Sequence, residues 1–292
     1  MSVDVLQDKI RKLKNPSVID FGVTPEHLPQ HLLDEEGSVL NAYCRFCREL
    51  MHGMKHLVPA VRFSFATFAL MSPEGMKELS DLLADAKSMG YYVLLDGPAV
   101  LSPWDADRTA SWCFREGSKY PCDGLIVNPY IGSDAVKPFL PYCRDGQKDL
   151  FLIIRTANKS AREYQDLLTG TRLFHMAVAD MLSRYGDPIM GKSGYSRICA
   201  MAAASAPDSL RNLRAKYKRT FLLVDGLDYP SGNAKNCSYA FDKLGHGAVV
   251  CAGPSVTAAW LDAQSDGADY VEQAILAAER MKKNITRYIT VL

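Results

Sequence analysis

The 292-residue sequence has no long apolar run and no long run of charges of one sign. No stretch approaches the roughly 20 consecutive apolar residues of a membrane-spanning helix. Basic residues (34) and acidic residues (33) nearly balance, for a formal net charge of +1. We therefore expect neither nucleic acid nor a membrane surface as the main partner. The amphipathic start at 1–10 lacks the regions of a secretory leader, so we expect a cytoplasmic protein.

The eight cysteines form no evident disulfide framework. They are scattered, and several lie inside apolar runs, which is typical of buried, reduced thiols. Cys44 and Cys47 have the spacing of a redox or zinc pair, but they lie in a helical pattern far from a second pair, which favours core packing. Two histidine pairs have i,i+4 spacing, namely His27 with His31 and His52 with His56. Neither shows a third ligand, so we expect no metal.

Eight short apolar runs recur along the chain, and almost every one ends in a polar residue or glycine. They are 18–20, 60–65, 92–96, 124–128, 150–156, 198–202, 221–226 and 248–253. Near-continuous apolarity is typical of strands buried on both faces, and amphipathic stretches of helical length separate the runs. The pattern predicts an α/β protein with one (β/α)8 TIM barrel over 1–292, preceded by a short helix at 4–13. Further helices are expected after a Ser38 cap, over 72–89 and over 173–185.

Polar residues at the ends of the runs mark a candidate site. They are Arg62, Asp96, Asn128, Arg155, Thr156 and Asp225. Chemistry in such barrels takes place at the carboxyl ends of the strands. Carboxylates and cations that converge there suit acid–base chemistry. Alternatively, some of them only pair with one another.

The loops after the last two runs contain Gly226, Gly232, Gly253 and Ser255. In (β/α)8 barrels these loops commonly hold phosphate, because glycine lets the backbone approach a ligand and a helix begins there. Ser255 would cap that helix. The glycines also fit plain tight turns, so both interpretations stay open.

Longer motifs point to a family. The longest is Asn128-Pro-Tyr-Ile-Gly-Ser-Asp-Ala-Val-Lys-Pro-Phe139, and 156–160, 164–166 and 191–196 follow. Shorter matches at 60–62, 95–96 and 226–232 keep the same order. Together these segments resemble the orotidine 5′-phosphate decarboxylase family in its longer bacterial subgroup, over nearly the whole chain.

The resemblance implies a cofactor-free and metal-free carboxy-lyase of pyrimidine nucleotide biosynthesis, which converts orotidine 5′-phosphate to uridine 5′-phosphate and CO2. It also implies a TIM barrel and a homodimer with active sites near the interface. The ligand would be a phosphorylated small molecule. Its predicted contacts are Thr24, Asn128, Thr156, Asn158, Gly226, Gly232, Gly253 and Ser255.

The sequence departs from the family's Asp-x-Lys-x-x-Asp motif. Asp96 matches the first aspartate, and Asp105 matches the second if about four residues are inserted. The lysine position then holds Ser102, or Pro98 without the insertion. The lysine is absent in either alignment. In the family it donates the proton to the carbon that loses CO2.

Three further positions differ. Arg62 replaces the lysine of the 60–65 run, Thr24 replaces a ribose-contacting aspartate, and Pro254 replaces the phosphate-binding arginine. Arginine is a poor proton donor, because its pKa lies above about 12. Proline supplies no charge-assisted contact to a phosphate.

Three hypotheses follow. The chain is a decarboxylase in which a displaced cation replaces the lysine; the candidates are Arg62, Lys137, Lys192 and Lys235. Alternatively, it is a catalytically inactive member that binds a nucleotide or phosphate, or interacts with a protein. As a third option it is another cofactor-free lyase or isomerase, with Asp96 and Asp105 as acid–base groups and Arg62 as an anion anchor. The segment 98–104 either reshapes the mouth for that chemistry or fills the pocket with Pro103 and Trp104.

Overall fold

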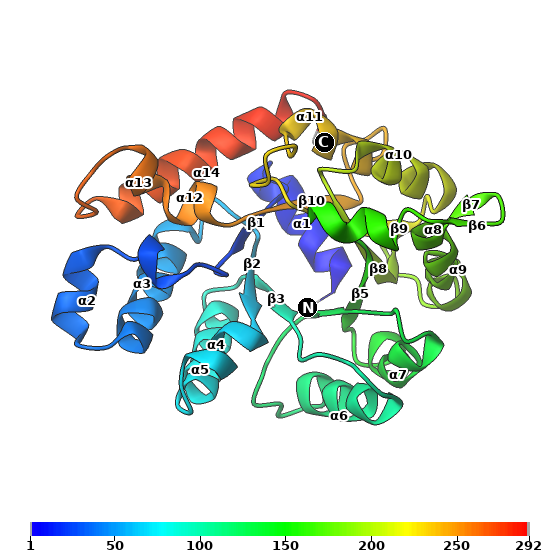
Figure 1. Cartoon of the computed structure of the whole chain (residues 1–292), viewed down its shortest axis with the longest axis horizontal. Coiled ribbons are helices and arrows are strands. Elements are labelled where there is room, and N and C mark those ends of the chain that lie inside the picture. Colours follow the sequence, from blue (N-terminus) through cyan, green and yellow to red (C-terminus); the bar gives the residue numbers. More distant parts are fainter. Residues whose placement is uncertain (1, 291–292) are drawn as a thin grey trace.

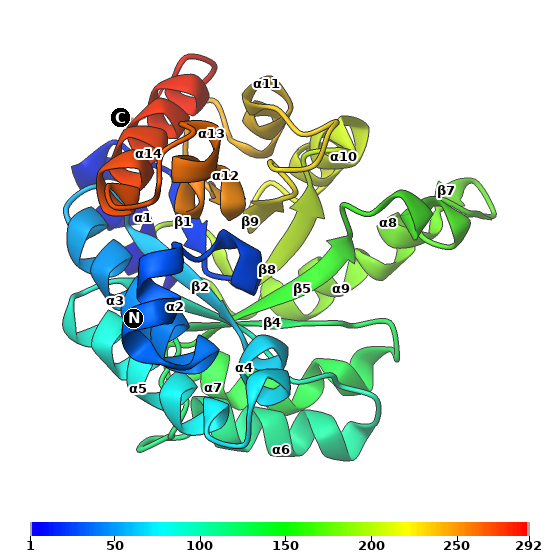
Figure 2. The same cartoon turned by 60° about the vertical axis from the view of Figure 1, so that its left-hand side comes forward.

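The computed structural model describes residues 2–290, and its centre is a closed barrel of eight parallel strands (Figures 1 and 2). Around the barrel the strands follow the order β1-β10-β9-β8-β5-β4-β3-β2. Their bounds are β1 Ser17–Asp20, β2 Ala60–Ser64, β3 Tyr92–Asp96, β4 Gly124–Val127, β5 Asp149–Arg155, β8 Ser196–Ala203, β9 Thr220–Asp225 and β10 Ala248–Ala252. Each of the eight apolar runs is a barrel strand, so the predicted TIM barrel is confirmed.

Helices surround the strands on the outside of the barrel (Figure 2). Their bounds are α1 Val3–Leu13, α2 Gln30–Glu36, α3 Val39–Met54, α4 Phe65–Met71, α5 Gly75–Ser88, α6 Pro103–Phe114, α7 Leu140–Arg144, α8 Phe174–Val178, α9 Asp180–Gly186, α10 Pro207–Lys216, α11 Ala234–Cys237, α12 Pro254–Thr257, α13 Ala259–Asp262 and α14 Tyr270–Thr286. A short hairpin, β6 Leu168–Thr169 and β7 Arg172–Leu173, extends from the barrel (Figure 2). No helix within 2–290 has the length and apolarity needed to cross a membrane.

Side chains along each strand point alternately outward and inward, and this divides the core into two layers. One set of residues, such as Val93 and Leu95, packs against the surrounding helices. The other set points into the barrel and includes Tyr92, Leu94 and Phe151. Because successive side chains of a strand point to opposite faces, the inward set continues to the strand ends. The polar residues there therefore meet at one mouth.

The helix α1 closes the opposite, amino-terminal end of the barrel (Figure 1). Its buried side chains Val3, Leu6 and Ile10 belong to the interior cluster. Two polar contacts hold α1 in place. The Ser193 N–H donates to the Asp4 carboxylate at 2.8 Å, and the Gly247 N–H donates to Gln7 Oε1 at 3.0 Å. Within residues 2–290, α1 thus covers the amino-terminal end of the barrel, and a cavity opens at the carboxyl-terminal mouth.

The helices expected from the sequence agree only in part with those of the structure. Ser38 caps α3, since its hydroxyl accepts the Asn41 N–H at 3.2 Å. The expected helix over 72–89 begins later, at Gly75, because residues 65–71 form the separate helix α4. The expected helix over 173–185 is two short helices, α8 and α9, that meet at Ala179.

All eight cysteines are buried and unpaired by disulfides. Cys44 and Cys47 lie on the buried face of α3, as the helical pattern indicated. Burial raises the pKa of the Cys44 thiol to about 12. These thiols are therefore packing groups rather than nucleophiles.

Candidate functional site

Four charged side chains meet at the barrel mouth. Asp20, Arg62, Asp96 and Asp225 come from the carboxyl ends of β1, β2, β3 and β9. They share the inward alternation of the interior residues below them, such as Val18. The sequence therefore brings them together through strand geometry alone.

Arg62 is the centre of this group. Its Nη2 lies 2.9 Å from Asp96, and its Nη1 lies 3.2 Å from Asp225 and 3.4 Å from Asp20. Only 10% of the Arg62 side chain is exposed. Burial opposes its charge, but the carboxylates outweigh burial and hold the pKa of Arg62 well above its ordinary range. Arg62 is thus a fixed positive charge that cannot donate a proton.

Asp20 carries a charge that its surroundings disfavour. Burial raises its pKa, and the neighbouring carboxylates of Asp225 and Asp96 add to the effect, while Arg62 opposes it. The Gly22 N–H donates to its Oδ1 at 2.9 Å. Three carboxylates around one guanidinium carry excess negative charge, which favours a proton on one of them. Asp20 is therefore a candidate acid.

The four-residue group opens into a cavity of about 450 Å³. Asp20, Arg62 and Asp225 line it together with Gly22, Gly226, Asp228, Tyr229, Pro230, Cys251, Gly253 and Pro254. We call this space the mouth cavity. Trp104 is 71% exposed at the start of α6, so it does not fill the pocket. The mouth is open and polar.

The segment after β3 places Asp105 away from Arg62. Ser102 caps α6, and its hydroxyl donates to the Asp105 carboxylate at 2.8 Å. Asp105 lines a separate cavity of about 280 Å³ with Phe65 and Trp112. Asp96 contacts Arg62, whereas Asp105 lines this separate cavity, so the predicted pair is not brought together within one chain.

A carboxylate from the loop after β9 contacts the backbone of the loop after β10. The Gly253 N–H donates to the Asp228 carboxylate at 2.6 Å. Gly226 has a φ of +76°, and an added Cβ would lie 2.5 Å from Ala157 Cβ, so this position requires glycine. Gly232 packs against the backbone of Gly226, which leaves no space for a ligand between them.

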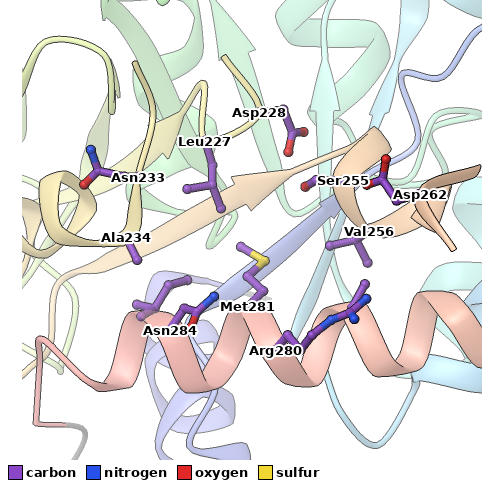
Figure 3. Close-up of a pocket in the computed structure, with 12 residues that line it drawn as sticks. Leu227, Asp228, Asn233, Ala234, Ser255, Val256, Asp262, Arg280, Met281 and Asn284 are labelled. Carbon is purple, nitrogen blue, oxygen red and sulfur yellow. The ribbon is translucent and has the colours of Figure 1, made fainter. Parts of the chain in front are cut away.

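Ser255 differs from the expectation. Gly253 holds the N-cap position of α12, and Ser255 lies inside that helix. It lines a cavity of about 670 Å³ between α11, α12 and α14 (Figure 3). Asp228 and Asp262 face this cavity with Arg280 (Figure 3). Ser255 is thus separated from the mouth cavity.

The loop after β5 is held by a hydrogen-bond network around the buried Arg155. Arg155 Nε and Nη2 each donate to the Asp166 carboxylate at 2.9 Å. The Thr156 N–H donates to the side chain of Gln165 at 2.9 Å, and the Thr156 hydroxyl donates to Asn158 Oδ1 at 2.6 Å. Asn158 lines a third cavity, beside the mouth.

The remaining expected contacts lie apart from Arg62. The Thr24 N–H donates to the His27 ring at 3.1 Å in the turn after β1. Asn128 is exposed and accepts the Tyr130 N–H at 3.0 Å. Among the expected contacts with a ligand, only Gly226 and Gly253 line the mouth cavity.

The alternative cations do not join the group either. Lys137 is exposed, and its Nζ lies 3.7 Å from Asp134 Oδ1. Lys235 is exposed in the first turn of α11. Lys192 precedes β8 beside the α1 contact of Asp4, at the amino-terminal end of the barrel. Lys192 therefore lies at the end of the barrel opposite the mouth.

Sequence reasoning missed several lining residues, notably Asp20, Asp228, Tyr229 and Cys251. Asp20 carried a signal, because it is the polar residue that ends the first apolar run. Asp228 carried none, since its role depends on a contact with Gly253 in another loop.

The geometry defines a class: a (β/α)8 barrel with a charged ligand cavity at its carboxyl-terminal mouth. The chain is 30% identical over 249 residues to the orotidine 5′-phosphate decarboxylase of Rhodopirellula baltica, covering 82% of each chain. It is 24% identical over 302 residues to that of Caldicellulosiruptor bescii, covering 98% of each. A structure of Leishmania donovani OMP decarboxylase has the same fold, with a TM-score of 0.73 at 20% identity over 99% of both chains. No family model matches the chain. The chain belongs to the orotidine 5′-phosphate decarboxylase family.

Proposed function

We propose that the mouth cavity binds a phosphorylated, nucleotide-like ligand and decarboxylates orotidine 5′-phosphate without a cofactor. The observation that carries this proposal is the open mouth with Arg62 among three strand-end aspartates. Family membership supplies the substrate class. Charged groups that the fold already holds in place suit a reaction that develops charge on carbon.

The roles follow from the pKa directions. Arg62 is the fixed charge that stabilises the carbanion formed when the bond to the carboxyl carbon breaks and CO2 leaves with the electron pair staying on the ring. It cannot return a proton, because its pKa is raised. Asp20 has a raised pKa and replaces the missing lysine as the donor of that proton. Solvent then reprotonates Asp20.

The test is turnover of orotidine 5′-phosphate by the pure protein, followed as loss of substrate absorbance. We expect activity in the wild type and loss of about 10²-fold or more in Asp20→Asn, which keeps shape but cannot donate that proton. Asp96→Ala should also lose activity, since it loosens Arg62. Lys137→Ala, on an exposed loop, is the matched control. Absence of turnover in the wild type, with correct folding shown by circular dichroism, would contradict decarboxylation.

One observation favours a second function, ligand binding without turnover. Among the described residues, no lysine lines the mouth cavity, and both terminal nitrogens of Arg62 are engaged by aspartates. Binding of uridine 5′-phosphate, measured by calorimetry, with no turnover of orotidine 5′-phosphate would establish it. Product analysis in the same assay would reveal another lyase or isomerase reaction.

We also propose that the protein is a cytoplasmic homodimer. Leu101, Trp104 and Trp112 are exposed apolar side chains at or next to α6, close to the Asp105 cavity. Burying them against a second copy would remove this patch from water. Trp104→Glu should halve the mass found by sedimentation, whereas Leu276→Glu on α14 should not. A monomeric wild type would refute the dimer.

A further inference from the structure

We propose that Asp228 is a built-in competitor for the phosphate group of the ligand, because its carboxylate holds the backbone N–H of Gly253. The proposal rests on the proposed function in one respect, that the ligand of the mouth cavity carries a phosphate. In (β/α)8 barrels the loops after the seventh and eighth strands commonly hold such a group, and in this chain these loops follow β9 and β10. The phosphate therefore competes with a carboxylate of the protein for the same donor.

The contested donor is the Gly253 N–H. It donates to Asp228 Oδ2 at 2.6 Å, a short hydrogen bond of the charge-assisted kind. Gly253 follows the last residue of β10, and the next residue, Pro254, has no N–H. The Asp228 contact thus occupies the backbone donor that residues 253–254 supply to the mouth cavity, which Gly253 and Asp228 both line.

Asp228 differs from the other aspartates of the mouth cavity in how it is held. Asp20 and Asp225 lie 3.4 and 3.2 Å from Arg62 Nη1. Asp228 is exposed, and within residues 2–290 it has no cationic side chain at ion-pair distance. The hydrogen bond to Gly253 is what holds its carboxylate, so a phosphate that takes this N–H can displace the carboxylate into water.

The Asp228 side chain has space to leave Gly253 without a change in the backbone. Asp228 lines the mouth cavity and also the cavity of about 670 Å³ between α11, α12 and α14 (Figure 3). Rotation about its own side-chain bonds turns the carboxylate away from Gly253 and towards this second space. The loop itself is closed by backbone hydrogen bonds, from the Tyr229 N–H to Gly226 O at 3.3 Å and from the Gly232 N–H to Tyr229 O at 2.7 Å. The backbone can thus stay in place while the side chain moves.

Like charge makes the two contacts mutually exclusive. A phosphate dianion and the Asp228 carboxylate repel each other, and one N–H cannot serve both with a short, straight hydrogen bond. Phosphate binding therefore includes the loss of the contact between Asp228 and Gly253, which lowers the affinity for phosphate-bearing ligands. A ligand without a phosphate leaves the contact intact. Asp228 thus sets how tightly the mouth cavity binds a phosphorylated ligand.

The experiment measures binding of uridine 5′-phosphate, inorganic phosphate and uridine to the full chain by calorimetry, in the wild type and three variants. Asp228→Ala removes the competing carboxylate. Asp228→Asn removes its charge but keeps an oxygen that can accept the Gly253 N–H. Asp262→Ala is the matched control, because Asp262 is also an exposed aspartate that lines the cavity of Figure 3.

We expect Asp228→Ala to tighten the binding of uridine 5′-phosphate and inorganic phosphate by about 10-fold or more, because a charge-assisted hydrogen bond no longer has to be broken. Asp228→Asn should tighten binding by less, since its amide oxygen still competes. Uridine binding should be unchanged in both variants, and Asp262→Ala should match the wild type. In nuclear magnetic resonance spectra of the wild type, the Gly253 amide signal should move when uridine 5′-phosphate is added, because its acceptor changes.

Three results would each overturn the proposal. They are an unchanged affinity for uridine 5′-phosphate in Asp228→Ala, equal gains in Asp228→Ala and Asp228→Asn, which would indicate repulsion at a distance, and a Gly253 amide signal that the nucleotide does not move. Failure of the wild type and Asp228→Ala alike to bind phosphate or nucleotide would also refute it. Binding by Asp228→Ala alone would support it.

The outcomes also separate this proposal from decarboxylation. If Asp228→Ala binds phosphate more tightly but orotidine 5′-phosphate is not turned over, the competition stands and the decarboxylase activity is refuted. If the wild type turns over orotidine 5′-phosphate and Asp228→Ala binds the nucleotide no more tightly, the activity stands and the competition is refuted.

Discussion

Replacing Arg62 by methionine removes the cation that three aspartates share, and it should destabilise the protein strongly. The Arg62 side chain is 10% exposed, and its nitrogens lie 2.9–3.4 Å from Asp20, Asp96 and Asp225. Removing one partner of a buried ion pair costs about 3–5 kcal/mol, because the remaining charges stay buried without compensation. For a chain of this length the unfolding entropy is about 0.6 kcal/mol per kelvin, so we expect the melting temperature to fall by about 5–8 °C.

The loss should depend on pH in a definite direction. Without Arg62 the three carboxylates repel one another, so the folded variant binds protons more tightly than the unfolded chain. A folded state that binds protons more tightly loses stability as pH rises through the folded pKa values. The loss of unfolding free energy in Arg62→Met should therefore be largest at pH 7.5, and it should shrink as the pH falls towards 4.

Arg45→Met is the matched control for calorimetric unfolding at these two pH values. Arg45 also contacts three carboxylates, with its nitrogens 2.6, 3.2 and 2.7 Å from Glu35, Glu36 and Glu49, but its side chain is 36% exposed on the surface of α3. Exposed pairs contribute about 0–1 kcal/mol. If Arg62→Met loses no more stability than Arg45→Met, or if its deficit does not shrink at low pH, the account of the mouth is wrong.

Three further changes test local features by thermal unfolding. Asp20→Asn should raise the melting temperature at pH 7.5 by about 2 °C, since the raised pKa shows that the folded state disfavours the ionised carboxyl, and the gain should vanish near pH 4. A lower melting temperature at pH 7.5 would contradict this. Ser38→Ala should cost about 1 kcal/mol because the Asn41 N–H loses its cap, whereas Ser38→Asp should cost little. Gly226→Ala should cost about 1–3 kcal/mol, because φ is +76° and the new Cβ would meet Ala157; an unchanged melting temperature would refute that strain.

Most of the barrel could be predicted from the sequence because a strand buried on both faces leaves a local pattern. The run 92–96 coincides with β3, and the other seven runs lie within about two residues of their strands. Short elements carry less signal. Residues 65–71 form α4 although they continue the apolar run of β2, and the helix pattern at 173–185 does not reveal the break at Ala179.

The site could be predicted only in part, because its contacts join distant residues. Arg62 and Asp225 are 163 positions apart, and they meet because both end inward-facing strand positions. Barrel geometry brings such residues together, so Arg62, Asp96 and Asp225 could be proposed in advance. The pairing of Asp228 with Gly253 depends on loop conformation, which no local pattern encodes. The same limit applies to Ser255, which faces the cavity of Figure 3 rather than the mouth.

The helix that closes the base of the barrel has a consequence for the order of folding during synthesis. The first helix leaves the ribosome before any strand, yet Asp4 meets Ser193 across 189 positions, and Gln7 meets Gly247 across 240. Val3, Leu6 and Ile10 keep an apolar face exposed until the last strands are made. The nascent chain therefore exposes the apolar face of α1 through most of translation. In this state chaperone binding competes with aggregation. Completion of β10 and burial of α1 belong to the same late, long-range step.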